Sequence, residues 1–188
     1  KTILAALLFI ASLKAFCGVV NHDRMYQAYL SNDMSVWKTE LQKYTASTDL
    51  TITDKLEISN YLYGYIATLL TDADKNKQEI IGWIELWEKY LEEIEKATGK
   101  NAYVHVYRSS INAYKSKVKA GGMMVWGPRS LTELKRALNI DPNNPLANGL
   151  KGNMLFYMPG FVGGDKEESI KWFEKALAGI AASTDKTF

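Results

Sequence analysis

Tyrosines recur at helical spacing in two stretches of the sequence, and they are the residues best suited to contact a ligand. Tyr103, Tyr107 and Tyr114 are spaced so that one helix would place them on one face. Tyr61 and Tyr65 share the same one-turn spacing. A tyrosine combines an apolar ring with a polar hydroxyl, which suits it to holding a peptide or an elongated small molecule. The alternative is that the rings pack between helices with their hydroxyls reaching water.

Two polar residues beside the longer tyrosine series could add recognition of polar groups. Arg108 and Asn112 fall next to it on the same predicted helix. The expected site for a partner or ligand therefore comprises Tyr61, Tyr65, Tyr103, Tyr107, Arg108, Asn112 and Tyr114.

The sequence contains no pattern typical of a catalytic centre. Neither G-x-S-x-G nor H-E-x-x-H occurs, and neither His22 nor His105 has a second ligand at metal-binding spacing on its helix face. Neighbouring carboxylates such as Glu92 and Glu93 point apart on a helix, so they cannot flank one bond. We predict no catalytic residue, no metal and no cofactor, and keep an enzyme with an unrecognised site as an alternative.

A glycine-rich segment, "PGFVGGDKEES", precedes the last predicted helix and could in principle hold a phosphate. A phosphate-binding loop follows a strand and presents free N–H groups with a lysine. Here a helix is predicted before the segment, and the Asp165 carboxylate would occupy the helix N-terminus. We therefore expect a structural turn, with a cap and with Phe161 packed inward. The loop and cap comprise Pro159, Gly160, Phe161, Gly163, Gly164, Asp165 and Glu168.

Helices must position these residues. Four prolines in 188 residues, with long stretches free of glycine, favour an all-α fold. We expect about eight helices, five of them spanning about 23–30, 34–44, 55–70, 102–119 and 128–140. A further helix carries an apolar series from Ile80 to Ile94 and ends at Gly99, residues 148–158 are helical, and the last helix follows its cap at Asp165. Asp54, with Glu57 three residues later, is expected to cap the third helix, and Pro128 to begin the sixth.

An internal repeat relates the last two predicted hairpins. Ser130, Leu134, Ala137 and Leu138 match Ser169, Phe173, Ala176 and Leu177 at one constant offset. Between them, Ala137 precedes Pro142, and Gly152 follows. This spacing resembles the tetratricopeptide repeat, although the unit is longer than the usual length of about 34 residues.

The resemblance implies a right-handed array of antiparallel helix hairpins, a tetratricopeptide-like solenoid with its partner on the concave face. It also implies packing roles for Ala137, Pro142, Gly152, Phe173 and Ala176. The enlarged loop is similar to that of exported bacterial repeat proteins, among them the periplasmic T-component of TRAP-type transporters.

The first residues resemble a secretory signal peptide. Lys1 precedes an apolar run, 3–13, that is too short to span a bilayer, and small residues follow near Cys17. We predict a signal peptide at 1–17 and a helical domain at 18–188. The last residues lack a helical cap, which leaves open whether further repeats follow Phe188. Lipid anchoring at Cys17 is the alternative to a periplasmic or secreted form, although residues 14–16 do not fit a lipoprotein signal.

Charge argues against nucleic acid as a partner. The chain has 23 basic and 21 acidic residues, and Lys1 and Lys14 would leave with the signal peptide, which gives 23 − 2 = 21 of each. The leading hypothesis is a non-catalytic protein-interaction or scaffold module of the bacterial cell envelope, with no membrane span after signal removal. The alternative is a periplasmic accessory protein that binds a small ligand for a transporter.

Overall fold

The computed structural model describes residues 21–182, and its regular elements are helices, which confirms the predicted all-α class. The α-helices are α2 (His22–Leu30), α3 (Met34–Thr45), α4 (Ile52–Leu69), α5 (Ala73–Thr98), α6 (Ala102–Val118), α7 (Gly122–Ile140), α8 (Pro145–Tyr157) and α9 (Lys166–Ala182). Short 3-10 turns span Leu70–Asp72 (η2) and Gly160–Val162 (η3). The predicted signal peptide lies outside the described residues. The chain divides into two compact units, Lys1–Ile58 and Ser59–Phe188, and the boundary falls within α4.

Unit 1 contains α2, α3 and the start of α4. Side-chain oxygens begin both of its first helices: Asn21 accepts from the Arg24 amide, and Asp33 accepts from the amides of Ser35 and Val36. These bonds satisfy backbone N–H groups that have no partner inside the helix. The Tyr44 hydroxyl accepts from the Asn21 amide at 2.8 Å and so joins the end of α3 to the start of α2.

The cap of α4 differs from the prediction. Thr51, not Asp54, begins the helix: the Thr51 Oγ1 accepts from the Asp54 amide at 3.1 Å, and Asp54 accepts from the Thr51 amide at 2.9 Å. This is the reciprocal capping arrangement, with Asp54 at its third position. The prediction started the helix one turn too late because it assigned the cap to the acidic residue.

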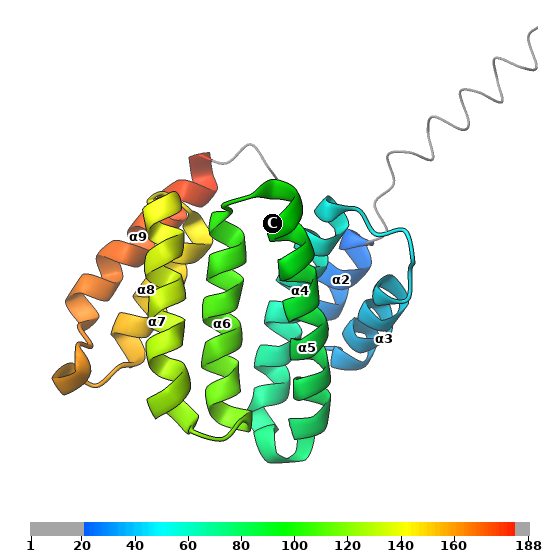
Figure 1. Ribbon diagram of the computed structural model, residues 1–188, viewed down its shortest axis with the longest axis horizontal. Coiled ribbons are helices and arrows are strands. Elements are labelled where there is room, and N and C mark those ends of the chain that lie inside the picture. The colour runs from blue at the N-terminus through cyan, green and yellow to red at the C-terminus, as the bar shows by residue number, and fades with distance from the viewer. Residues whose placement is uncertain (1–20, 183–188) are drawn as a thin grey trace, which may run out of the picture. The chain divides into compact units, whose positions relative to one another are not determined.

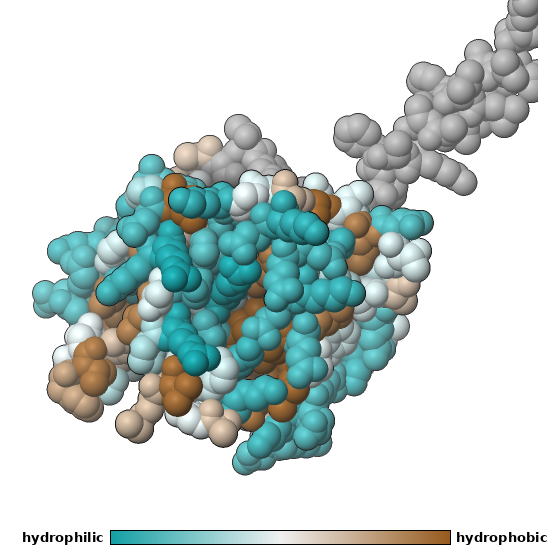
Figure 2. All heavy atoms as spheres, viewed as in Figure 1, coloured by the Kyte–Doolittle hydropathy of each residue, from teal (hydrophilic) through white to brown (hydrophobic). Residues whose placement is uncertain are grey.

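Unit 2 is built from consecutive helix pairs. α6 packs along α7, α8 packs along α9, and α5 lies against α6 (Figure 1). The apolar series predicted on α5 is buried: Ile80, Ile84, Trp87, Leu91 and Ile94. Figure 2 shows hydrophilic side chains over the outward faces of α5, α6 and α7. The amphipathic pattern of α5 therefore directs its apolar face into the core.

α7 begins earlier than predicted. The segment expected as a loop before Pro128 is helical from Gly122, so Pro128 lies inside the helix. Proline cannot donate a backbone hydrogen bond to the carbonyl of Met124 one turn earlier. The prediction that Pro128 begins the helix is therefore wrong, because Pro128 lies in the interior of α7.

Four of the five predicted repeat residues are packed between helices, whereas Pro142 is exposed. The solenoid arrangement and its right-handedness remain predictions. Ala137 and Ala176 are buried. A Cβ atom on Gly152 would lie 2.7 Å from the Phe173 ring, so glycine permits the close approach of α8 and α9. Pro142 is exposed and follows the α7 C-cap, Asp141.

The loop between α8 and α9 is a hydrogen-bonded turn, as expected. Gly163 has a φ of 97°, and a Cβ on Gly164 would lie 1.8 Å from the Met158 carbonyl oxygen. Asp165 accepts from the Glu168 amide at 2.9 Å, which confirms its capping role. Pro159 and Gly160 lead into the 3-10 turn.

Two details of this loop contradict the expectation. Phe161 is 91% exposed and does not pack inward, because the turn at residues 160–162 directs it away from α8 and α9. Glu168 does not return the capping bond: the Asp165 amide donates instead to the Leu155 carbonyl. Glu168 accepts from Trp172 at 3.2 Å.

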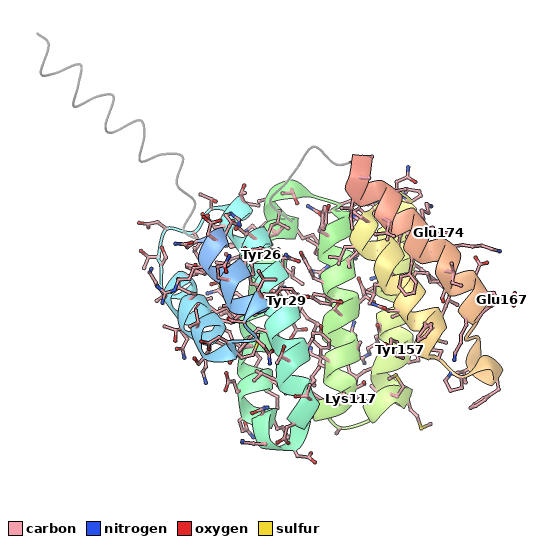
Figure 3. All side chains as sticks on the ribbon, turned by 180° about the vertical axis from the view of Figure 1, so that it is seen from behind. Tyr26, Tyr29, Lys117, Tyr157, Glu167 and Glu174 are labelled. Atoms are coloured by element: carbon pink, nitrogen blue, oxygen red, sulfur yellow. The ribbon has the colours of Figure 1, made fainter. Side chains whose placement is uncertain are left out.

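We expect Asp165→Ala to lower the free energy of unfolding by about 1 kcal/mol, because it removes the oxygen that satisfies the Glu168 amide. Urea denaturation measures the change. Glu167→Ala is the matched control, since Glu167 is an exposed acidic residue in the same first turn (Figure 3) and is not the cap. Equal losses in both variants would contradict the capping role.

Candidate functional site

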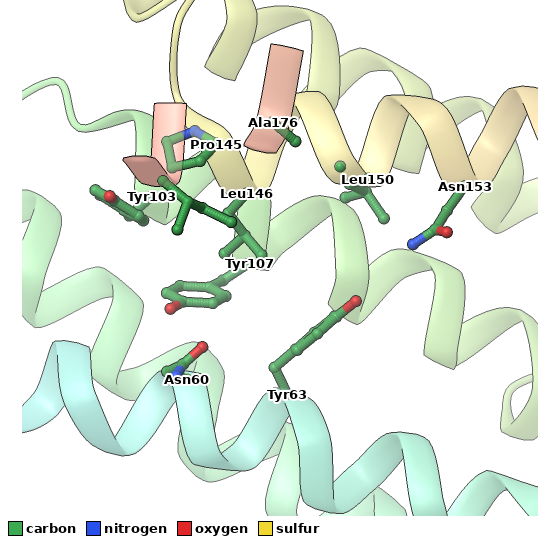
Figure 4. Close-up of a pocket in the computed structure, with 11 residues that line it drawn as sticks. Asn60, Tyr63, Tyr103, Tyr107, Pro145, Leu146, Leu150, Asn153 and Ala176 are labelled. Atoms are coloured by element: carbon green, nitrogen blue, oxygen red, sulfur yellow. The ribbon is translucent and has the colours of Figure 1, made fainter. Parts of the chain in front are cut away.

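A cavity of about 310 Å³ lies within unit 2 (Figure 4). α4, α6 and α8 each contribute to its wall, and α9 closes one side. Its lining residues are Asn60, Tyr63, Tyr103, Tyr107, Pro145, Leu146, Gly149, Leu150, Asn153, Ala176 and Ile180. We call this cavity the tyrosine pocket. Among the predicted binding residues, the structure brings Tyr103 and Tyr107 together here.

Tyr107 lies deepest in the tyrosine pocket. Its side chain is fully buried, and its hydroxyl has no hydrogen-bond partner among the described residues. Figure 4 shows this hydroxyl on the Asn60 side of the pocket. The ring of Trp87 lies behind Tyr107, with centroids 5.4 Å apart. A buried hydroxyl without a partner costs about 1–3 kcal/mol, and such groups are uncommon in native proteins.

Tyr63 forms the opposite wall and is held in place by Tyr114. The two rings stack with centroids 6.1 Å apart, and the Tyr114 hydroxyl donates to the Tyr63 carbonyl at 3.0 Å. Tyr114 does not line the tyrosine pocket. Of the three tyrosines predicted to share one face of α6, Tyr103 and Tyr107 thus line the pocket. Tyr114 instead holds Tyr63, which forms the opposite wall.

The remaining wall of the tyrosine pocket is mainly apolar. Leu146, Leu150 and Ile180 come from α8 and α9, while Asn60 and Asn153 supply amide groups. The lining includes no charged side chain. Such a surface suits an apolar, flat molecule that needs a few hydrogen bonds at its edge.

Burial controls the ionisation of these tyrosines. Desolvation raises the pKa of Tyr63 above its ordinary value, and it raises the pKa of Tyr107 further, with smaller contributions from neighbouring Tyr103 and Tyr63. In unit 1, burial raises the pKa of Tyr44 to about 12. Tyr63 and Tyr107 are therefore neutral hydrogen-bonding groups at physiological pH.

We expect the free energy of unfolding to fall as the pH rises above about 10. In the unfolded chain, Tyr44, Tyr63 and Tyr107 then lose protons that they retain in the folded protein. The stabilisation is therefore complete below the unfolded pKa and is lost above it. Urea denaturation at about pH 8 and about pH 11 measures the change. Tyr44→Phe removes a tyrosine whose folded pKa is about 12, and should reduce the pH dependence. Ionisation of every tyrosine near its ordinary pKa in the folded protein would contradict this explanation.

The other predicted binding residues lie outside the tyrosine pocket. Tyr65 is buried and donates to Glu79 at 2.8 Å, and Tyr61 is not among the lining residues. Arg108 donates to Glu95 at 2.7 Å, and Asn112 lines a separate polar cavity of about 120 Å³. Arg108 lines this small cavity too, so the structure brings Arg108 and Asn112 together there and leaves them apart from Tyr103. A role for these four residues in binding a partner remains a prediction.

His105 is more closely paired than the sequence indicated. It is buried, and its Nδ1 lies 2.6 Å from Glu133, which also accepts from Arg136. Glu133 is on α7, so no spacing along α6 could have revealed the contact. Among residues 21–182, no group of histidine, cysteine, aspartate and glutamate side chains is arranged to hold a metal ion.

Sequence reasoning missed Tyr63 as a candidate. It selected Tyr61 and Tyr65 because they are one turn apart, whereas Tyr63 lies between them on another face of α4. The spacing between Asn60 and Tyr63 could have indicated it. These residues are three apart, so they share one face of α4, and both line the tyrosine pocket.

Comparisons with known proteins give one informative similarity. No protein-family model matches the chain, and no curated protein matches it. Among solved structures, the chain is similar to the HusA haemophore from Porphyromonas gingivalis, with a TM-score of 0.63 and 20% sequence identity. The match covers 85% of this chain and 78% of that chain. At this identity the similarity shows a shared helical fold, and the resemblance to tetratricopeptide and TRAP proteins is not confirmed.

Proposed function

We propose that unit 2 binds a hydrophobic small molecule in the tyrosine pocket, and that this ligand is a flat tetrapyrrole of the haem type. The observation that carries the proposal is the cavity itself, in which Tyr63, Tyr103 and Tyr107 face an apolar wall from α8 and α9. Its volume of about 310 Å³ is within the range typical of small-molecule sites. Aromatic rings provide large contact surfaces for a flat ligand at little cost in side-chain entropy.

The name of the structural neighbour supports the choice of ligand class. A haemophore binds haem, and HusA has the same fold over most of both chains. The similarity also supports the proposal that this chain is exported. None of the helices in residues 21–182 is long and apolar enough to cross a membrane. The role we propose is binding without catalysis, close to the ligand-binding alternative derived from the sequence.

The residues of the pocket fit the apolar body of haem better than its charged edge. Tyrosine oxygen is one of the protein ligands of haem iron. However, burial raises the pKa values of Tyr63 and Tyr107, which disfavours the anionic form that binds iron best. The lining has no cation to pair with a carboxylate, so the carboxylates must remain in water. Apolar contact should therefore supply most of the affinity.

Titration of the protein with haemin tests the proposal. We expect saturable one-site binding, measured from the absorption band of the porphyrin and from quenching of tryptophan fluorescence, since Trp87 lies behind Tyr107. Metal-free protoporphyrin should bind with an affinity within about tenfold, a difference of about 1.4 kcal/mol. If neither porphyrin gives saturable binding, the tetrapyrrole proposal is wrong. If only haemin binds, iron coordination contributes more than apolar contact.

The protein-interaction hypothesis receives less support from the arrangement of its residues. Tyr65 and Arg108, which were expected to meet a partner, already bind Glu79 and Glu95. A partner would have to displace these bonds, at a cost to its own affinity. We therefore place small-ligand binding ahead of a scaffold role.

A further inference from the structure

One end of unit 2 exposes apolar side chains on two turns. The turn between α6 and α7 leads into Met123 and Met124, which are 61% and 90% exposed. The turn between α8 and α9 carries Phe161 and Val162, and Phe161 is 91% exposed. Both turns lie at the lower end of the helix pairs in Figure 1, and Figure 2 shows apolar side chains along the lower left edge there. We call Met123, Met124, Phe161 and Val162 the apolar tip.

Backbone hydrogen bonds give both turns a defined shape. The Val125 amide donates to the Gly121 carbonyl at 3.2 Å, where Gly121 has a φ of 88°. The indole of Trp126 donates to the Ala120 carbonyl at 3.0 Å. On the second turn, the Gly163 amide donates to the Gly160 carbonyl at 3.0 Å. The turns thus hold the apolar tip toward solvent, where exposed apolar patches commonly mark an interaction surface.

The sequence around the first turn is basic. "KSKVKAGGMMVWGPR", residues 115–129, contains Lys115, Lys117, Lys119 and Arg129 and no acidic residue. Lys115 and Arg129 lie 5.0 and 4.8 Å from the centre of the Trp126 ring. Glu88 on α5 pairs with Lys115, and the Lys119 ammonium lies 3.9 Å from Glu85.

The two other turns at this end of unit 2, between α4 and α5 and between α8 and α9, do not add a net negative charge next to the first turn. The turn between α4 and α5 has Asp72 and Asp74 beside Lys75 and Lys77, so its charges balance. At the start of α9, Lys166 lies 5.3 Å from the centre of the Phe156 ring, while Asp165 caps the helix. Because glutamates of α5 lie beside Lys115 and Lys119, the positive charge that is not offset next to Met123 and Met124 comes from Lys117 and Arg129.

We propose that the apolar tip docks on the surface of an anionic phospholipid bilayer. Methionine and phenylalanine side chains would enter the boundary between headgroups and acyl chains, and Lys117 and Arg129 would lie near the lipid phosphates. Protruding turns suit this role because a bilayer yields to small projections, whereas a stable protein interface needs about 800 Å² of matched surface on each partner. This inference does not depend on the ligand of the tyrosine pocket.

Site-specific fluorescent labels test the docking directly. In a Cys17→Ser background of the full chain, Met124→Cys or Phe161→Cys is labelled with an environment-sensitive dye. Vesicles of phosphatidylcholine with phosphatidylglycerol should shift the emission of both labels to the blue, and vesicles of phosphatidylcholine alone should shift it much less. Leu177→Cys is the matched control, because Leu177 is an exposed apolar residue on α9 away from the apolar tip. The local labels separate docking by the tip from any membrane binding by residues 3–13.

The charge requirement has its own test. Lys117→Ala should weaken binding to the phosphatidylglycerol vesicles about fivefold, corresponding to about 1 kcal/mol for one basic residue near an anionic surface. Lys96→Ala, at the opposite end of α5, should leave it unchanged. Added salt should weaken binding of the unaltered chain, because it screens the attraction. Absence of a shift at positions 124 and 161, or an equal shift at position 177, would overturn the proposal in favour of a protein partner.

Discussion

Tyr63→Ala is expected to weaken the binding of haemin by about tenfold or more, with the helix content unchanged. Tyr63 supplies the ring on the α4 side of the tyrosine pocket, facing the apolar wall from α8. Its loss removes contact area with a flat ligand and admits water to the cavity. Porphyrin titration gives the affinity, and far-ultraviolet circular dichroism confirms the fold.

Two control variants make this result specific to the pocket. Tyr157→Ala removes a tyrosine that is 79% exposed at the end of α8 and does not line the tyrosine pocket, so affinity should not change. Tyr114→Phe removes the hydroxyl that donates to the Tyr63 carbonyl but keeps the stacked ring. It should have a smaller effect than Tyr63→Ala. If all three variants lose affinity equally, the porphyrin binds the protein surface without using this pocket.

Gly152→Leu is expected to lower the free energy of unfolding by about 3 kcal/mol, which is the upper end of the usual cost of overpacking. A Cβ at this position would already lie 2.7 Å from two carbons of the Phe173 ring. The larger side chain must push α9 away from α8 or force Phe173 out of its position. Urea denaturation followed by circular dichroism measures the loss.

A control variant separates the steric clash with Phe173 from the general effect of replacing a glycine within a helix. Gly82 lies in α5, and nothing lies within 4 Å of the position of a Cβ there. Gly82→Ala should therefore stabilise the protein by up to about 1 kcal/mol, through its better helix propensity. Combining Gly152→Leu with Phe173→Ala should restore part of the stability, because the ring that causes the clash is removed. Failure of the second change to help would indicate a clash elsewhere.

The sequence predicted the helices well where apolar periodicity was strong. The buried series on α5 and the close contact at Gly152 both follow from local spacing and from the repeat. The errors arose at positions decided by contacts distant in sequence. Pro128 was placed at a helix start because proline favours that position, yet preceding residues continue the helix. Phe161 was assigned to the core from its hydrophobicity, although its turn directs it into solvent.

The candidate site was harder to predict than the helices. Tyr103 and Tyr107 were predicted from their spacing on one helix. The third tyrosine of the pocket, Tyr63, depends on which face of α4 lies opposite them. Single-helix spacing identifies residues that share a face and leaves open what lies across from that face. Arg108 illustrates the limit: it is adjacent to Tyr107 in sequence and binds Glu95 of α5 instead of lining the pocket.

The two kinds of contact in the tyrosine pocket come from separate parts of the chain. The tyrosines belong to α4 and α6, whereas most apolar lining residues belong to the hairpin of α8 and α9. Changes in that hairpin could therefore alter the size and shape of the accepted ligand while the aromatic wall stays constant. Exchanging residues 145–182 between proteins of this fold would be a direct way to transfer ligand preference.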